Sequence, residues 1–445
     1  MHAFQTIEWL DMRLAAPADW EIVRHSVRPE RGRLALVDRR HQRMLLSWVA
    51  CTSPDLDQAF DDYRSRGREE DPEARFEDFT GPGRWRGLRR RGKRGVLTMT
   101  GQYDARLGRW IEMVLDWPDG FDAALERAVL QRFAVTDPAG PARWRAFQIN
   151  LESPREWRLS KADVRPADVT FTLVRGGDTI TVRRAGMTEA WFGGDLESLV
   201  RLHVGDVPMQ TSERTVGGHA ALFAESRERQ PRLRSLLVRP QRRRDLAWMC
   251  PESHAVFEIT TLTRGREPLD PETLRVECCP CESPAPVAPS ASPRAIRRAA
   301  VGAAKTDDAT VAAVELLDAV PLHSRAVRVT QGPAGEKVFH VPLERKWYMG
   351  PPLGWIMPFR RERAVSLDPL GMEVWRSCDG QTSIETIVER FAAAHRLPFH
   401  ESRLAVMEFL RQLTQRGLIA VIGPSTESAD ADLESGAAPA LGGER

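Results

Sequence analysis

The stretch from residue 363 to residue 423 constrains the fold most, because its own residues mark where short helices begin and end. A short alternating segment, Arg363 to Leu367, predicts a strand. Asp368 followed by Pro369 then predicts a helix start, since aspartate caps unpaired backbone N–H groups and proline lacks a donor that the first helical position leaves unused. Gly380 is expected to end this helix.

Two further helices and a strand are predicted in the same stretch. Thr382 and Glu385 stand at capping-box spacing at the start of the second helix. Apolar residues then recur on one helical face, namely Ile384, Ile387, Val388, Phe391 and Ala392. The third helix is expected from about residue 400 to residue 416, with Gly417 as the left-handed residue that stops it. Residues 418 to 422 predict a return strand, which completes the outline of a small winged-helix module.

These residues resemble the PqqD family, the peptide-recognition module of pathways that modify ribosomally made peptides. Recurring features of the family are a Leu-Asp-Pro or Leu-Asn-Pro start, a Trp near the end of the first helix, an Asp-Gly stop, a Thr-x-x-Glu start and a final Leu-x-x-x-Gly-Leu-type end. The matching positions are Leu367, Asp368, Pro369, Trp375, Asp379, Gly380, Thr382, Glu385, Leu413, Gly417 and Leu418. The resemblance implies a RiPP recognition element, a chaperone that presents a precursor peptide to a peptide-modifying enzyme, for example a radical SAM enzyme.

The resemblance also implies where the peptide binds. A leader peptide would add a strand to the edge of the module's sheet, beside the last helix. An open strand edge offers unpaired backbone groups for affinity, and side-chain pockets beside it give specificity. The residues expected at this site are Arg363, Val365 and Leu367 on the strand, and Leu404, Glu408 and Arg411 on the helix.

The N-terminal part of the chain repeats a phrase. The segment Leu14-Ala-Ala-Pro-Ala-Asp-Trp20 is echoed by Leu151-Glu-Ser-Pro-Arg-Glu-Trp157, with Leu, Pro and Trp each displaced by 137 positions. We therefore predict an α+β protein with two tandem copies of one antiparallel-sheet domain, residues 1–140 and 141–281. The order of elements distantly resembles the Mog1/PsbP-like fold, a likeness of architecture that implies no function.

The remaining boundaries follow from composition. Residues 282–320 begin rich in Pro, Ala and Ser and predict a flexible linker with a short helix near its end. Residues 321–423 form the predicted PqqD-like winged-helix module, and residues 424–445 predict a disordered tail. A flexible linker would keep a bound peptide at high effective concentration near whatever the duplicated domains hold.

Charge and hydropathy argue against several function classes. The chain has 64 Lys and Arg against 62 Asp and Glu, a formal net charge of +2, so no global excess favours nucleic acid or an anionic membrane. The sequence lacks an apolar run of about 18 residues, and its start lacks the basic region and apolar core of a secretion signal. We expect a cytoplasmic protein with no membrane partner.

Two nucleic-acid hypotheses have simpler alternatives. A winged helix often reads DNA with its third helix, but residues 401–416 mix acidic and basic side chains, whereas a duplex reader concentrates positive charge. A basic run at residues 84–94, interleaved with Trp85, could stack on bases or hold an acidic peptide. Alternation in a hairpin would instead place this run on a solvated face, opposite the acidic residues 69–77.

The six cysteines include a crowded group, Cys278, Cys279 and Cys281. Thiolates suit a soft metal, and Cys250 with His254 could complete a tetrahedral zinc site if the chain brings them near Cys278. Redox chemistry and incidental loop thiols are the alternatives, since the sequence has no second Cys-x-x-Cys pair.

The sequence contains none of the common catalytic signatures. It has no Gly-x-Ser-x-Gly, phosphate-loop, His-Glu-x-x-His or dinucleotide motif, and no Cys-x-x-x-Cys-x-x-Cys triplet for an iron–sulfur cluster. We therefore expect no catalytic residue, and the hypothesis is a peptide-binding adaptor. The alternatives are a structural or regulatory scaffold whose module makes protein–protein contacts, and a metal-dependent enzyme that would need zinc.

Overall fold

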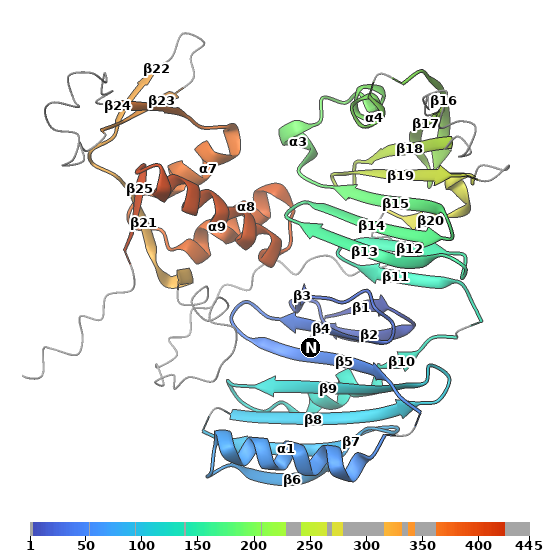
Figure 1. Ribbon diagram of the computed structural model, residues 1–445. Coiled ribbons are helices and arrows are strands. Elements are labelled where there is room, and N and C mark those ends of the chain that lie inside the picture. Colours follow the sequence, from blue (N-terminus) through green and yellow to red (C-terminus); the bar gives the residue numbers. More distant parts are fainter. Residues whose placement is uncertain are drawn as a thin grey trace, which may run out of the picture. The chain divides into compact units, whose positions relative to one another are not determined.

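The computed structural model describes residues 3–52, 54–93, 95–137, 139–205, 207–227, 242–264, 269–278, 316–331, 337–342 and 362–422. These residues form two compact units, one built on the N-terminal strands and one on the C-terminal helices (Figure 1). Both units combine helices with antiparallel strands, which confirms the predicted α+β class.

Three antiparallel sheets build the N-terminal unit. The first large sheet has the order β3 (Glu21–Arg24), β4 (Arg31–Val37), β5 (Gln42–Ala50), β9 (Arg109–Trp117), β8 (Gly95–Asp104), β7 (Arg86–Gly92) and β6 (Arg75–Thr80). The second large sheet has the order β13 (Arg158–Arg165), β14 (Asp168–Arg175), β15 (Asp178–Ala185), β19 (Ala255–Thr263), β18 (Arg242–Cys250), β17 (His219–Arg227) and β16 (Met209–Val216). The shared sheet has the order β10 (Ala134–Val135), β2 (Met12–Pro17), β1 (Phe4–Trp9), β11 (Ala142–Ala146), β12 (Ile149–Ser153) and β20 (Arg275–Glu277).

A period-two pattern of apolar residues determines which face of each strand is buried. In β9 every second residue is buried, including Ile111, Met113 and Leu115, and β14 buries Val169 and Phe171 in the same way. Because successive side chains of a strand point to opposite faces, this alternation turns one face of each large sheet toward the core. One continuous hydrophobic core draws residues from all three sheets.

The two large sheets have the same order of connections. Adding ten to each strand number of the first order gives the second. A β-bulge also interrupts each sheet at matching places, between Ile22 and Arg24 in one and between Leu159 and Lys161 in the other. Ile22 and Leu159 are 137 positions apart, and so are Arg24 and Lys161. The repeated phrase in the sequence has the same offset.

The shared sheet joins the first half of the unit (β1 to β10) to the second half (β11 to β20). Its central pair is β1 with β11, where Glu8 lies opposite Arg145. The turn from β1 to β2 and the turn from β11 to β12 both contain two non-glycine residues of positive φ, Leu10 and Asp11 in one and Phe147 and Gln148 in the other. A tight hairpin turn requires this left-handed backbone, so the two turns share one conformation.

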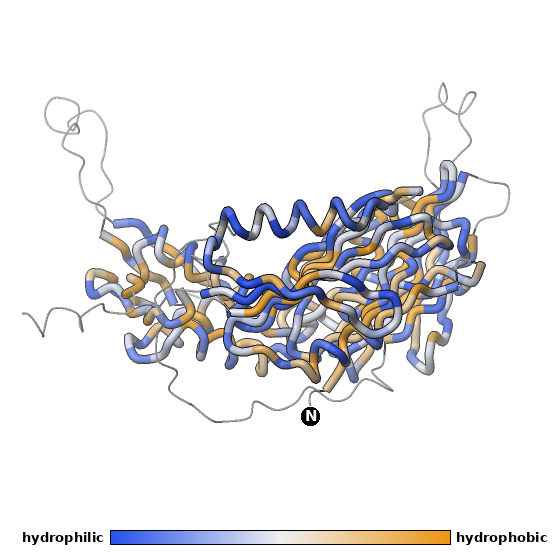
Figure 2. Tube along the Cα trace, turned by 90° about the horizontal axis from the view of Figure 1, so that it is seen from below, coloured by the Kyte–Doolittle hydropathy of each residue, from blue (hydrophilic) through white to orange (hydrophobic). Residues whose placement is uncertain are grey.

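The helices of the N-terminal unit are short and differ between its halves. The first half has α1 (Leu56–Glu70), capped by Asp55, and α2 (Ala123–Gln131), capped by Asp122. Figure 2 shows α1 as a largely hydrophilic helix. The second half has α3 (Thr188–Trp191), α4 (Leu196–Val204), capped by Asp195, and the 3-10 turn η1 (Pro271–Thr273).

The C-terminal unit places three helices between strands. Its elements are η2 (Leu316–Asp318), β21 (Val320–His323), β22 (Arg328–Gln331), β23 (Lys337–Pro342), β24 (Glu362–Ser366), α7 (Pro369–Ser377), α8 (Ile384–His395), α9 (Phe399–Gln415) and β25 (Ile419–Ile422). The strand, three helices and return strand expected after residue 362 occur in that order (Figure 1). The strand β25 pairs with β21, whereas β24 belongs to a separate sheet of order β22-β23-β24.

The predicted start of the first helix and the predicted end of the third agree with the structure. Asp368 caps α7, and its Oδ1 accepts a hydrogen bond from the backbone N–H of Gly371 at 2.8 Å. Gly417 has a φ of 73°, the left-handed backbone that glycine adopts without strain, and its N–H donates to the carbonyl oxygen of Thr414 in the last turn of α9. The first helix ends earlier than expected, at Ser377, and the left-handed Gly380 lies beyond its C-cap and donates its N–H to the carbonyl oxygen of Pro321 on β21.

The start of the second helix differs from the expected capping box. Ser383, not Thr382, caps α8, since its hydroxyl accepts a hydrogen bond from the backbone N–H of Thr386 at 3.3 Å. Thr382 instead donates its hydroxyl to Asp379 at 2.9 Å. The aspartate side chain already organises the turn before the helix, and the cap moves one residue along the chain.

The buried core of the C-terminal unit includes residues that precede position 321. Leu317 and Ala319 are fully buried, and the carbonyl oxygen of Ala319 accepts a hydrogen bond from the backbone N–H of Ile384 at 2.9 Å. Most of the predicted linker, residues 282–315, and the predicted tail, residues 424–445, lie outside the described residues.

Candidate functional site

The strand β24 lies at the edge of its sheet. It pairs on one side with β23, and within the described ranges no strand pairs with its other side. An edge strand presents backbone N–H and C=O groups that can pair with another chain. The described part of the C-terminal unit therefore has the open edge that strand addition requires.

The predicted strand residues have different surroundings. Val365 is 8% exposed and lies opposite the fully buried Phe339 on β23, so its side chain belongs to the core. Arg363 is exposed, and Leu367 lies half-buried just beyond the end of β24. Strand addition uses the main chain, so burial of Val365 still leaves its backbone at the sheet edge.

The predicted helix residues lie on the exposed face of α9. Leu404 is 49% exposed and is therefore accessible to a ligand. Glu408 and Arg411 form an exposed ion pair within the helix, with Arg411 Nη2 2.5 Å from Glu408 Oε1. Hydrogen bonds from Arg411 and then from Gln412 lower the pKa of Glu408 to about 2. The carboxylate is therefore charged throughout the physiological pH range.

The structure does not link the strand residues directly to the helix residues. Among the described residues, no hydrogen bond or ion pair joins Arg363, Val365 or Leu367 to Leu404, Glu408 or Arg411. A Cβ added at Gly371 on α7 would lie 3.8 Å from Phe409, so α9 packs beside the start of α7, directly after β24. That the two sets form one groove remains a prediction.

Trp375 has a structural position. Its ring stacks on His323 of β21 with centroids 4.0 Å apart and meets Phe339 of β23 edge-on at 4.8 Å. A ring nitrogen of His323 also lies 2.7 Å from the carbonyl oxygen of Trp375. The tryptophan thus joins α7 to two strands from separate sheets, which is a structural role.

Two of the predicted metal ligands lie together, with a histidine that the sequence reasoning missed. The ligand atoms of Cys250, Cys278 and His219 all lie within 4.8 Å of one another. His254 lies elsewhere, with its Nδ1 3.2 Å from Glu189. The other two candidates, Cys279 and Cys281, lie outside the described residues.

The missed histidine could have been found only through strand pairing. The last matched pair of β17 and β18 is Ala221 with Trp248. Continuing that register by two residues brings His219 beside Cys250 on the same face. Nothing in the local sequence around His219 indicates this neighbour.

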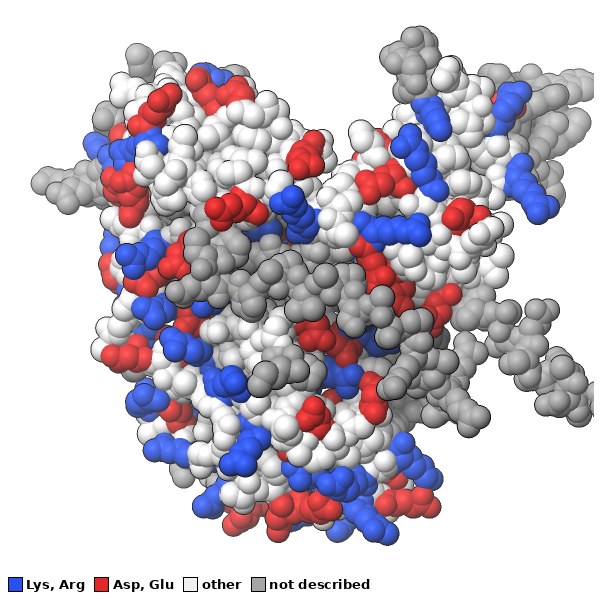
Figure 3. Space-filling view, turned by 180° about the vertical axis from the view of Figure 1, so that it is seen from behind, with Lys and Arg blue, Asp and Glu red and all other residues white. Residues whose placement is uncertain are grey.

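The basic run of the first large sheet faces acidic partners. Arg91 lies 3.2 Å from Glu77, and Lys93 lies 2.9 Å from Glu73. Trp85 is buried at 2% exposure, so it cannot stack on a base at the surface. Figure 3 shows basic and acidic side chains interspersed on the visible face, which agrees with the solvated-face alternative and argues against a nucleic-acid surface.

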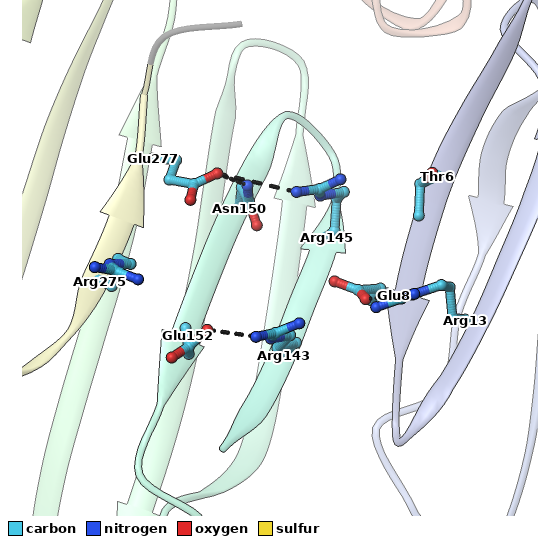
Figure 4. Close-up of a pocket in the computed structure, with 9 residues that line it drawn as sticks. All are labelled: Thr6, Glu8, Arg13, Arg143, Arg145, Asn150, Glu152, Arg275 and Glu277. Carbon is cyan, nitrogen blue, oxygen red and sulfur yellow. Dashed lines mark hydrogen bonds and ion pairs between the residues drawn. The ribbon is translucent and has the colours of Figure 1, made fainter. Parts of the chain in front are cut away.

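Two hollows lie on the N-terminal unit. A charged one of about 350 Å³ opens on the shared sheet (Figure 4) and is lined by Thr6, Glu8, Arg13, Arg143, Arg145, Asn150, Glu152, Arg275 and Glu277. Three of its arginines are paired: Arg13 with Glu8 at 2.8 Å, Arg143 with Glu152 at 3.1 Å and Arg145 with Glu277 at 3.9 Å. A groove of about 1030 Å³ lies over the first large sheet, and its lining includes Trp48, Val49, Tyr63 and Trp110.

The comparison with protein families identifies the C-terminal module. Residues 355–419 match the family model described as Coenzyme PQQ synthesis protein D (PqqD), a range that contains β24 and the three helices α7, α8 and α9. No curated protein matches the chain. Among the described residues, no helix is both long enough and apolar enough to cross a membrane. The resemblance seen in the sequence is thus confirmed, and the C-terminal module of this chain is a PqqD-family domain.

Proposed function

We propose that this protein is a non-catalytic, peptide-binding adaptor. Its PqqD-family domain would capture an extended precursor peptide by strand addition and present it to a peptide-modifying enzyme. The open outer edge of β24 is the observation that carries the proposal. Backbone hydrogen bonds along that edge would supply affinity without requiring a particular peptide sequence.

The buried side chain of Val365 supports this mode of binding. It anchors β24 against Phe339, so the strand is already held in the conformation that a peptide needs. A preorganised edge loses little conformational entropy when the ligand arrives, and more of the interaction energy then appears as affinity.

Peptide selectivity would come from the exposed face of α9. Leu404 offers an apolar contact for an anchor residue of the peptide. Glu408 and Arg411 carry both signs of charge in one place, and an exposed pair of this kind costs little to rearrange. A peptide with an apolar anchor and flanking charges would fit this face.

The N-terminal unit would dock or position the modifying enzyme. We infer that its halves are a domain duplication, supported by the equal strand orders, the matching β-bulges and the matching turns. The groove over the first large sheet is a candidate contact surface, since Val49 in its lining is 45% exposed. Exposed apolar side chains in a groove are typical of contact sites.

The second candidate is a scaffold whose module contacts another folded protein. The exposed Leu404 on α9 favours it, because an exposed apolar side chain can contact a folded partner as well as an extended peptide. Neighbouring genes would separate the two functions, since an adaptor should be encoded beside a small precursor peptide and a modifying enzyme.

The direct test is titration of the full chain with a synthetic precursor peptide encoded by a neighbouring gene. Leu404→Asp should weaken binding at least tenfold, because it places a charge where an apolar anchor is expected. Val329→Asp is the matched control, since Val329 lies on β22 at the opposite edge of the sheet and is similarly exposed, at 42%. Equal losses in both variants, or no binding by the unchanged protein, would contradict the adaptor function.

A further inference from the structure

Three side chains of metal-binding type meet in the second half of the N-terminal unit. His219 is the first residue of β17, Cys250 is the last residue of β18, and Cys278 follows directly after β20. Their ligand atoms lie within 4.8 Å of one another. They come from two sheets, since β17 and β18 belong to the second large sheet and β20 to the edge of the shared sheet.

The fold brings them together through long-range pairing. Gly217 and Gly218 form the turn before His219 with φ values of 55° and 84°, a conformation open to glycine at little cost. This turn starts β17 at His219, and pairing with β18 places the histidine beside Cys250. The pairing of Leu151 with Val276 holds β20 against β12. The chain therefore leaves the shared sheet close to His219 and Cys250, and Cys278 is the next residue.

The two thiols are close but are not joined in a disulfide. Cys250 is fully buried, and its Sγ lies 3.8 Å from the carbonyl oxygen of Cys278. Thiolate sulfur and imidazole nitrogen are the preferred ligands of zinc, and bonds of about 2.0–2.3 Å would place tetrahedral ligand atoms about 3.3–3.8 Å apart. A separation within 4.8 Å therefore needs only small side-chain movements to reach that geometry.

We propose that His219, Cys250 and Cys278 bind a zinc ion. Three protein ligands leave the fourth tetrahedral position for a water molecule or another ligand. The strand β20 is only three residues long, and the ion would connect its end to the second large sheet. Its role is to stabilise the edge of the shared sheet, and it stands independently of peptide binding by the PqqD-family domain.

The test is the zinc content of the full chain, purified without chelators and measured by elemental mass spectrometry. The unchanged protein should hold about one zinc ion per chain, because thiolate sulfur and imidazole nitrogen are preferred ligands of zinc. His219→Gln, Cys250→Ala and Cys278→Ser should each lose most of it. Replacing zinc with Co²⁺ should give thiolate-to-cobalt charge-transfer absorption that is lost in the same variants.

Two variants serve as controls. His254→Gln should retain zinc, because this imidazole contacts Glu189 instead. Cys51→Ser removes a cysteine of the first half and should also retain it. Because Cys250 is buried and its replacement can impair folding, the half-buried His219 gives the decisive variant, with circular dichroism to show that it folds.

Three results would overturn the proposal. One is an unchanged protein that contains no zinc and does not take up Co²⁺. Another is retention of zinc by folded His219→Gln. The third is a Cys250–Cys278 disulfide in protein purified under reducing conditions, detected by mass mapping, since those thiols would then be unable to bind the ion.

Discussion

The two halves of the N-terminal unit share an order of strands but fasten their sheets by different means. In the first half, Glu126 of α2 is 3% exposed and lies 2.5 Å from Arg89 of β7, and the hydroxyl of Thr98 also donates to it. The Arg89 guanidinium lies 4.8 Å from the ring of Phe79 and 4.5 Å from that of Phe121. A buried ion pair between aromatic rings thus holds α2 on the first large sheet.

In the second half, the described residues between β19 and β20 include the short turn η1 and no α-helix. The cluster of His219, Cys250 and Cys278 lies where β17 begins and β18 ends. β8, the counterpart of β18 in the strand order, ends at Asp104 where β18 ends at a cysteine. The same strand order is thus compatible with different local contacts. Functional side chains should be sought at the places where the two halves differ.

The largest expected effect is in the first half. Glu126→Ala should lower the free energy of unfolding by about 3–5 kcal/mol, because it removes the acceptor of both the largely buried Arg89 guanidinium and the buried Thr98 hydroxyl. Chemical denaturation of the full chain, followed through the N-terminal transition, measures this loss. Glu272→Ala, which breaks an exposed pair with Arg214 in the second half, should cost only about 0–1 kcal/mol. Equal losses would show that the ion pair does not fasten α2.

The next prediction tests whether the halves are equivalent in their core. Leu36 and Leu173 are both fully buried and stand 137 positions apart. Leu36→Ala and Leu173→Ala should each lower the free energy of unfolding by about 2–5 kcal/mol, through lost apolar burial and the cavity left behind. Similar losses in denaturation would support a duplicated core. A large loss at one position and almost none at the other would break the comparison.

A smaller effect concerns carboxylates on the matching strands β9 and β19. Burial raises the pKa of Asp116 on β9. The pKa of Glu258 on β19 is lowered: burial acts to raise it, but His203 and Arg183 together outweigh burial. A lowered pKa contributes stability above the unfolded value of about 4.5, and this contribution is lost as pH falls.

Glu258→Gln should therefore cost about 1–3 kcal/mol at pH 7 and progressively less below about pH 4.5, because charged hydrogen bonds to Arg183 and His203 are lost only where the carboxylate is ionised. Asp116→Asn should be neutral or stabilising at pH 7, because it removes a charge that burial disfavours. Denaturation at a series of pH values measures both. A cost for Glu258→Gln that does not change with pH would contradict the assignment.

The smallest expected effect is local and follows from the zinc proposal. β10 and β20 occupy opposite ends of the shared sheet, and only β20 adjoins the cysteine and histidine cluster. Removing zinc with a chelator should speed backbone hydrogen exchange at Arg275–Glu277 and leave Ala134–Val135 unchanged. Hydrogen exchange with mass spectrometry measures both peptides. A change of equal size at both edges would contradict the proposal that the zinc ion stabilises only the β20 edge.

Much of the C-terminal module could be predicted from its sequence. Asp368 and Gly417 act within one turn of the helix end that each of them forms, so their roles follow from neighbouring residues alone. The cap of α8 was misplaced by one residue, because the hydroxyl of Thr382 donates to Asp379 and Ser383 accepts the capping hydrogen bond instead. The pairing of β25 with β21 was not predicted, since strand alternation gives a face but no partner.

The sequence by itself determined the α+β class, the helix ends of the PqqD-family domain and the repeated phrase of the N-terminal unit, because these depend on residue type and on short or regular spacing. Only the tertiary structure decided that β24 lies at a sheet edge, that β1 pairs with β11, and that His219 rather than His254 lies beside Cys250. Each of these depends on the register between distant strands. Residue patterns and turns constrain the register of a strand once its partner is known, but they do not say which distant strand that partner is.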